Sequence, residues 1–311
     1  MLSTHNILSI RDLSLADVEL VLDTARSFEE VNERAIKKLP TLRGRTVVNL
    51  FLEPSTRTRT SFELAAKRLS ADAVNISGSS SAAVKGESLK DTAKTLSSMS
   101  CDLVVIRHSR AGAPWVLAEH MSCCVVNGGD GRHEHPTQAL LDLYALRKRL
   151  GRLDGLTVGI VGDVAHSRVA GSLVPALRLV GARPIVIAPP TLLPARPDVL
   201  GAEVAHDLDD VLPELDVAYM LRVQAERLER SPFPSVREYA RYYGMNAERL
   251  AAARPGMVVA HPGPMNRGVE VTAEVADSDR ALVLGQVNAG VAVRMALMYL
   301  LLGGGGSEDA S

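Results

Sequence analysis

Short apolar runs alternate with longer stretches of helical periodicity along most of the chain. Continuous apolar runs predict buried strands at 46–51, 103–106, 123–126, 157–163, 184–188 and 257–260. Apolar residues recurring at helical spacing predict helices at 60–69, 87–99, 137–150, 169–180 and 288–302. Apolar strands that alternate with helices are typical of parallel sheets with both faces covered. We therefore expect an α/β fold with two doubly wound parallel-sheet domains joined by interdomain helices.

A glycine-bounded break near residues 151–155 divides this pattern. We expect residues 1–150 to form one domain and residues 151–287 a second, with helix 288–302 packing back on the first. The length of 311 residues suits about two domains of ordinary size. The Gly-rich, polar stretch 303–311 predicts a disordered tail.

Charge and composition narrow the class of protein. The balance of 35 basic and 36 acidic residues argues against nucleic acid as a partner held by general charge. No membrane span is expected because no apolar run of about 18 residues is evident. The N-terminus lacks the pattern of a secretory signal, so we expect a cytoplasmic protein. Three cysteines, Cys101, Cys123 and Cys124, favour buried thiols over a disulfide framework or a zinc site.

The strongest chemical signal lies between the predicted strand 46–51 and the helix that follows it. The segment is Ser55-Thr56-Arg57-Thr58-Arg59. A helix start presents unpaired N–H groups and a partial positive charge, and hydroxyls and arginines beside it suit a phosphate. The alternative is an ordinary helix capped by Ser55. Capping explains one hydroxyl but not three interleaved with two arginines, so we favour an anion site.

Three other segments of the first half carry candidate groups. His135 and Gln138 follow strand 123–126, where His135 can donate to a carbonyl oxygen and Gln138, one helical turn later, can bind an amide. Arg107 directly follows strand 103–106. Ser81 and Lys85 lie in a Ser- and Gly-rich loop that can close over an anion, or be an ordinary solvated loop. The His133-Glu134-His135 pattern also suggests a metal, but no third ligand is evident, so we predict none.

In the second half, arginines again follow predicted strands. Arg168 comes after strand 157–163, and Arg222-Val223-Gln224 comes after another short apolar run. Arginine suits a bidentate grip on carboxylates, so two of them suit a dicarboxylate. The segment His261-Pro262-Gly263-Pro264 follows the last strand, and its prolines leave carbonyls to accept from an NH2 group, or simply make a rigid turn. A full dinucleotide motif is absent, so no nucleotide cofactor is predicted.

Taken in order, these motifs resemble the aspartate/ornithine carbamoyltransferase family across nearly the whole chain. The ornithine enzymes typically carry cysteines where this chain has Thr137 and Pro262, and Arg222-Val223-Gln224 is similar to the aspartate branch. Two cations there would also repel the ammonium of ornithine. The resemblance implies transfer of the carbamoyl group of carbamoyl phosphate to the α-amine of L-aspartate, in pyrimidine biosynthesis.

The resemblance implies a role for each motif. The phosphate would be bound by Ser55, Thr56, Arg57, Thr58 and Arg107. The carbamoyl carbonyl would be polarised by Thr58, Arg107 and His135. The carbamoyl NH2 would be held by Gln138 and by the carbonyls of Gly263 and Pro264. Arg168 would bind the α-carboxylate of aspartate, and Arg222 and Gln224 the β-carboxylate.

Further implications concern partners. Ser81 and Lys85 would enter from a neighbouring subunit, which makes the active unit a homotrimer with shared active sites. Glu53 and Arg227 would orient the arginines that bind aspartate. The resemblance leaves open a larger assembly with regulatory or dihydroorotase-type chains, and it implies no cofactor and no metal.

Three other functions compete with this interpretation. A carbamoyltransferase for another amino acid would be separated by product analysis with a panel of amines. A dinucleotide-dependent dehydrogenase, suggested by two α/β halves, would bind NAD saturably. A non-catalytic phosphate-binding module would bind phosphate analogues without turnover.

Overall fold

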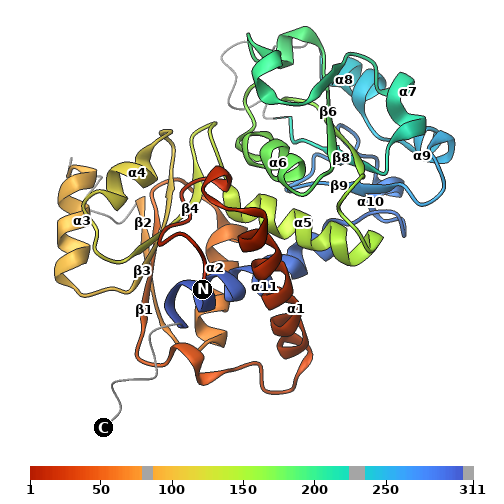
Figure 1. Ribbon diagram of the computed structural model, residues 1–311. Coiled ribbons are helices and arrows are strands. Elements are labelled where there is room, and N and C mark those ends of the chain that lie inside the picture. The colour runs from red at the N-terminus through yellow and green to blue at the C-terminus, as the bar shows by residue number, and fades with distance from the viewer. Residues whose placement is uncertain (79–86, 224–234, 304–311) are drawn as a thin grey trace. The chain divides into compact units, whose positions relative to one another are not determined.

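The computed structural model describes residues 1–78, 87–223 and 235–303, and it divides the chain into two compact units (Figure 1). Unit 1 contains Met1–Tyr144 and the residues from Asn288 on, and unit 2 contains Ala145–Val287. The division thus falls inside the helix that the sequence placed at 137–150. The expected tail lies, from residue 304 on, outside the described residues.

Unit 1 is built on a parallel sheet of four strands in the order β2-β1-β3-β4. The strands are β1 Thr46–Phe51, β2 Asp72–Ser77, β3 Leu103–His108 and β4 Cys124–Asp130. The helices are α1 Leu15–Glu33, α2 Thr56–Arg68, α3 Leu89–Ser98, α4 Ala113–Ala118 and the first part of α5 Pro136–Leu150. The order reverses after β1, because β2 pairs on one side of it and β3 on the other. In such sheets, ligands bind at the carboxyl ends of the strands at this switch point.

Both faces of this sheet are covered, as the apolar strands predict. Figure 1 shows α3 and α4 on one side of the strands and α1, α2 and α11 (Val283–Leu302) on the other. On the first side, strand residues such as Val48, Leu50 and Ile106 pack with Ala93 and Leu96 of α3. The burial of these side chains stabilises the sheet. The register of its strands determines which residues meet at the carboxyl ends, where the site lies.

Unit 2 repeats the scheme with a parallel sheet of five strands in the order β7-β6-β5-β8-β9. The strands are β5 Thr157–Val161, β6 Arg183–Ile187, β7 Glu203–Ala205, β8 Val217–Met220 and β9 Val258–Ala260. The helices are α6 Arg168–Leu179, α7 Leu208–Val211, α8 Val236–Tyr243, α9 Ala247–Ala252 and α10 Ala273–Ala276. Here the order reverses after β5, so the switch point lies between β5 and β8.

The predicted α/β fold with two parallel sheets is confirmed, while several bounds differ. Helix α2 starts at Thr56 rather than at 60, so the turn is tighter than predicted. Short elements such as β7, α7 and α9 carry too little periodicity to be predicted from sequence.

Helix α11 corrects the expectation that no segment is apolar enough to cross a membrane. It starts at Val283 rather than 288, and among the described residues it alone has the necessary length and hydropathy. Its most apolar window is 56% buried within the fold, and Ala292, Val293 and Met295 are fully buried. Such burial is typical of a core helix.

Candidate active site

The predicted anion-binding turn lies at the switch point of unit 1. Strand β1 ends at Phe51, and α2 begins at Thr56 after one turn. Ser55 occupies the N-cap position in an extended conformation, but its side chain makes no capping hydrogen bond to the helix. The idea that Ser55 caps α2 through its hydroxyl is therefore wrong. The first N–H groups of α2 are directed toward the start of the helix, where an anion site requires donors.

The other predicted residues of the turn differ in exposure. Thr56 and Arg57 are exposed, whereas Thr58 is buried, with 8% of its surface accessible. Ser61 donates to the Thr58 carbonyl at 3.0 Å, which anchors this first turn of the helix. The start of α2 thus carries an exposed hydroxyl group and an exposed cation, those of Thr56 and Arg57.

Register places Arg107 beside this turn. It is the penultimate residue of β3, where it pairs with Phe51, and the N–H of Leu52 donates to the Arg107 carbonyl at 2.9 Å. Its guanidinium Nη1 donates to the Gly128 carbonyl at 3.1 Å, and Nε lies 3.6 Å from Glu53 Oε2. The predicted role of Glu53 was to orient the arginines that bind aspartate; its described ion pair is with Arg107. The structure therefore brings a fixed guanidinium to the anion-binding turn.

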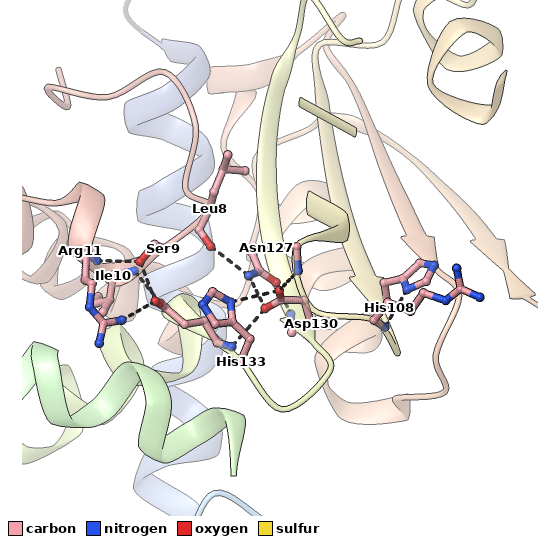
Figure 2. A network of polar contacts seen from close by, with 12 residues as sticks. Leu8, Ser9, Ile10, Arg11, His108, Asn127, Asp130 and His133 are labelled. Carbon is pink, nitrogen blue, oxygen red and sulfur yellow. Dashed lines mark hydrogen bonds and ion pairs between the residues drawn. The ribbon is translucent and has the colours of Figure 1, made fainter. Parts of the chain in front are cut away.

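The loop between β4 and α5 is held by two buried carboxylates, Asp130 and Glu134 (Figure 2). Asp130 accepts from Asn127 Nδ2 at 2.9 Å, from Gly112 N at 2.8 Å and from Glu134 N at 3.1 Å. Glu134 in turn accepts from Ser9 Oγ at 2.6 Å, Ile10 N at 2.9 Å and Arg11 Nη1 at 2.8 Å. The sequence analysis gave neither residue this supporting role; the partners of Glu134 lie more than 120 positions away in the sequence.

His135 and Gln138 sit directly after this anchored loop. His135 is 4% exposed, and its carbonyl accepts from Gln138 N at 2.9 Å as α5 begins. Gln138 Nε2 donates to Asp142 Oδ1 at 3.0 Å, which leaves its amide oxygen as the acceptor for an NH2 group. The side chains of the His133-Glu134-His135 motif have different partners. His133 forms a hydrogen bond with Asp130, and Glu134 with residues 9–11. In the described part of the chain, no group of three or more suitable side chains could hold a metal.

The sequence analysis did not identify one buried cation of unit 1. Arg294 of α11 is 3% exposed, its Nη1 donates to Ser61 Oγ at 2.5 Å, and its guanidinium lies 4.7 Å from the ring centre of Phe62. Burial lowers its pKa to about 9; the charge of Asp142 opposes this shift and that of Arg107 adds to it. Arg294 therefore places a buried guanidinium against α2, the helix whose start forms the anion-binding turn.

The predicted acceptor residues of unit 2 lie after neighbouring strands. Arg168 begins α6 after β5, with Ser167 capping the helix through Ala170 N at 3.2 Å, and Arg222 follows β8. Because Val161 and Met220 pair across β5 and β8, both arginines lie at the switch point of this sheet. Arg168 is buried and Arg222 half-buried.

Gly263 and Pro264 follow β9, which pairs with β8, so the third predicted segment lies at the same sheet edge. The peptide bond between them is cis. Sequence reasoning missed the buried polar residues that support this segment, Glu270 and Gln286. Ser81, Lys85, Gln224 and Arg227 lie outside the described residues.

Both units match enzyme domains of one family. Residues 5–148 match the carbamoyl-P binding domain of the aspartate/ornithine carbamoyltransferases, and residues 154–301 match their Asp/Orn binding domain. The fold and its two strand-end sites are thus those of a two-domain carbamoyltransferase. The chain belongs to the aspartate/ornithine carbamoyltransferase family, as its motifs predict.

Individual relatives come from the aspartate branch. The chain is 60% identical to the aspartate carbamoyltransferase catalytic subunit of Thermobifida fusca, over 96% of each chain. It is 58% identical to the same subunit of Parafrankia sp., over 99% of each chain. The crystal structure of aspartate transcarbamoylase from Trypanosoma cruzi in complex with N-(phosphonacetyl)-L-aspartic acid superposes with a TM-score of 0.86, at 33% identity over 94% of both chains.

Proposed function

We propose that this chain is an aspartate carbamoyltransferase, which transfers the carbamoyl group of carbamoyl phosphate to the α-amine of L-aspartate. The products are N-carbamoyl-L-aspartate and phosphate. Relatives that share 52–60% identity over nearly the whole chain bear the name of that enzyme's catalytic subunit. The structural observation that carries the proposal is the position of Arg107, held in register beside the anion-binding turn.

Carbamoyl phosphate binding is assigned to unit 1. Ser55, Thr56, Arg57, Thr58 and Arg107 bind the phosphate. The helix start supplies N–H donors and a partial positive charge, and the arginines supply the formal charge that a dianion needs. Thr58, Arg107 and His135 are proposed to polarise the carbamoyl oxygen. The amide oxygen of Gln138, whose Nε2 is bound to Asp142, accepts from the carbamoyl NH2.

The reaction follows from this distribution of charge. The neutral amine of aspartate attacks the carbamoyl carbon and forms a tetrahedral intermediate with a negative oxygen. Donors fixed before the reaction stabilise that oxygen, and the loss of one such donor lowers kcat by about 10²–10³. The bond between carbon and the phosphate oxygen then breaks, and the leaving phosphate takes the proton of the amine. The remaining task of the protein is to hold two anions together.

Acceptor choice is assigned to unit 2. Arg168 binds the α-carboxylate, Arg222 and Gln224 bind the β-carboxylate, and the carbonyls of Gly263 and Pro264 help to hold the carbamoyl NH2. Paired guanidiniums favour a dicarboxylate and repel an acceptor whose side chain is cationic. Another amino acid with two carboxylates remains the competing acceptor.

Assembly and location form a further part of the proposal. We propose a cytoplasmic homotrimer in which Ser81 and Lys85 of one subunit complete the site of its neighbour. Larger assemblies with regulatory or dihydroorotase-type chains remain open.

The deciding experiment is an assay with labelled carbamoyl phosphate and a panel of acceptors. We expect label in N-carbamoyl-L-aspartate, with aspartate preferred over ornithine, glutamate and a monocarboxylic amine. Transfer to ornithine, or phosphate release without a carbamoylated amine, would contradict the assignment.

A further inference from the structure

A buried carboxylate in unit 2 joins two segments that each carry acceptor-site residues. Glu270 has no accessible surface. Its Oε1 accepts from Val223 N at 2.8 Å and from Asn266 Nδ2 at 2.8 Å, and its Oε2 accepts from Asn266 N at 2.7 Å. Asn266 Nδ2 also donates to the Val223 carbonyl at 3.2 Å, so Asn266 and Val223 are joined both directly and through Glu270. The side chain of Glu270 thus connects the end of β8 with the loop after β9.

His261 extends this cluster and has a defined tautomer. The N–H of Gly263 donates to His261 Nδ1 at 2.8 Å, so Nδ1 carries no proton and Nε2 does. The protonated Nε2 lies 3.8 Å from Glu270 Oε2. The His261 N–H donates to Gln286 Oε1 at 3.0 Å. The loop that contains Gly263 and Pro264 is therefore held at both ends by buried polar groups.

The chemistry of the cluster requires a carboxylate. Two backbone N–H groups and an amide NH2 all point at Glu270, and only an ionised carboxylate accepts at both oxygens without offering a donor. Burial raises the pKa of Glu270, but the nearby His261 ring N–H and the hydrogen bonds from Val223 and Asn266 outweigh it, so the net shift is downward. The group is therefore a buried anion whose position is set by its donors.

We propose that Glu270 is a positioning residue for the acceptor amino acid, because it sets the segment 221–223 against the loop 263–266. Val223 directly follows Arg222, and Asn266 lies two residues after Pro264. This role rests on the proposed function, in which Arg222 binds the acceptor and the carbonyls of Gly263 and Pro264 hold the carbamoyl NH2. A bidentate arginine contact tolerates little displacement, and errors of about 1 Å can cost about 10²-fold in rate.

The test is Glu270→Gln in the full chain. Glutamine keeps the size of the side chain but places an NH2 group against Val223 N–H or Asn266 N–H. We expect the KM for aspartate to rise about tenfold or more, since the loss of one charge-assisted hydrogen bond is of that order. The KM for carbamoyl phosphate should rise by less than that for aspartate, because Glu270 acts on carbamoyl phosphate only through the two loop carbonyls, while the phosphate-binding residues of unit 1 are unchanged.

Glu134→Gln is the matched control. Glu134 is equally buried and also accepts from backbone N–H, but it holds the loop before His135 in unit 1. We expect it to raise the KM for carbamoyl phosphate and not that for aspartate. If Glu270→Gln leaves the KM for aspartate unchanged, or if both variants raise both constants alike, Glu270 has no positioning role.

Two further measurements keep the proposal decidable. If Glu270→Gln does not fold, Asn266→Ala, which removes the Asn266 Nδ2 contacts at a half-buried position, must raise the KM for aspartate, or the proposal fails. The second measurement needs no activity: amide hydrogen exchange at Val223 and Asn266 should be faster in Glu270→Gln than in the wild type. A wild-type protein that makes no N-carbamoyl-L-aspartate overturns the proposed function alone, whereas unchanged exchange at these amides overturns the positioning role.

Discussion

The Arg107 guanidinium is held between Glu53 and Gly128. Its Nε lies 3.6 Å from Glu53 Oε2, its Nη1 donates to the Gly128 carbonyl at 3.1 Å, and both charged side chains are 11% exposed. Glu53 comes from the loop after β1, and Gly128 from β4, so three strand ends converge on one cation. The guanidinium is therefore oriented before any substrate arrives.

Glu53→Gln should test this orientation. The amide keeps the volume of the side chain but removes the charge that fixes Arg107, so the donor becomes less well aimed at the developing oxyanion. We expect kcat to fall about tenfold, with the KM for aspartate within about twofold. The control is Glu63→Gln on α2, whose carboxylate pairs with the exposed Lys67 at 2.6 Å. Equal kcat values for the two variants would show that Glu53 does not orient Arg107.

Arg57→Ala should separate activity from stability. Arg57 is exposed at the start of α2, so its loss should change the free energy of unfolding by only about 0.5 kcal/mol. Loss of a cation that binds the leaving phosphate should lower kcat/KM for carbamoyl phosphate by at least about 10²-fold. Arg43→Ala is the matched control, since Arg43 is exposed just before the opposite end of β1. Near-normal turnover by Arg57→Ala would remove Arg57 from the phosphate site.

The proposed trimer with shared active sites predicts complementation between inactive variants. Lys85→Ala and Arg57→Ala chains should each be nearly inactive alone. After equal mixing and reassembly, about a quarter of the sites combine an intact Arg57 with an intact Lys85 from the neighbour, so about a quarter of wild-type activity should return. Activity that stays at the level of the separate variants would indicate that each site lies within one chain.

The fold was largely predictable because parallel strands buried on both faces leave continuous apolar runs. The runs at 103–106 and 123–126 become β3 and β4 with nearly every residue buried. Arg107 was found for the same reason, since a charge directly after the apolar run 103–106 stands out. Arg168 was found because it lies at the start of the helix that follows the next such run in the second half.

The supporting residues were beyond sequence reasoning because their meaning depends on distant partners. Glu134 binds residues about 125 positions away, and Glu270 binds Val223 across 47 positions. Arg294 is the only charged residue of α11, and only the fold shows that it contacts Ser61 and Phe62. The local sequence pattern identifies candidate substrate-binding residues. The residues that fix their positions can be identified only from tertiary contacts.

The start of α1 offers a prediction on pH and stability. Asp17 accepts from Ser14 N at 3.0 Å and Ser14 Oγ at 2.6 Å, and from Ser3 N at 2.8 Å. Burial raises its pKa, but the hydrogen bonds from Ser14 and Ser3 outweigh it and lower the pKa from 3.8 to about 2. Because the folded pKa is depressed, the stabilisation is complete above the unfolded pKa and is lost as pH falls toward 2.

Asp17→Asn should therefore cost about 1–2 kcal/mol of unfolding free energy at pH 7, allowing for solvent screening. The amide mimics the protonated acid, so the difference from wild type should shrink between pH 4 and about pH 2. Urea unfolding of both proteins at several pH values measures this difference directly. Asp23→Asn, on the same helix but outside its first turn, controls for the loss of one negative charge. A difference that stays constant between pH 7 and pH 2 would mean that ionisation of Asp17 does not stabilise the helix start.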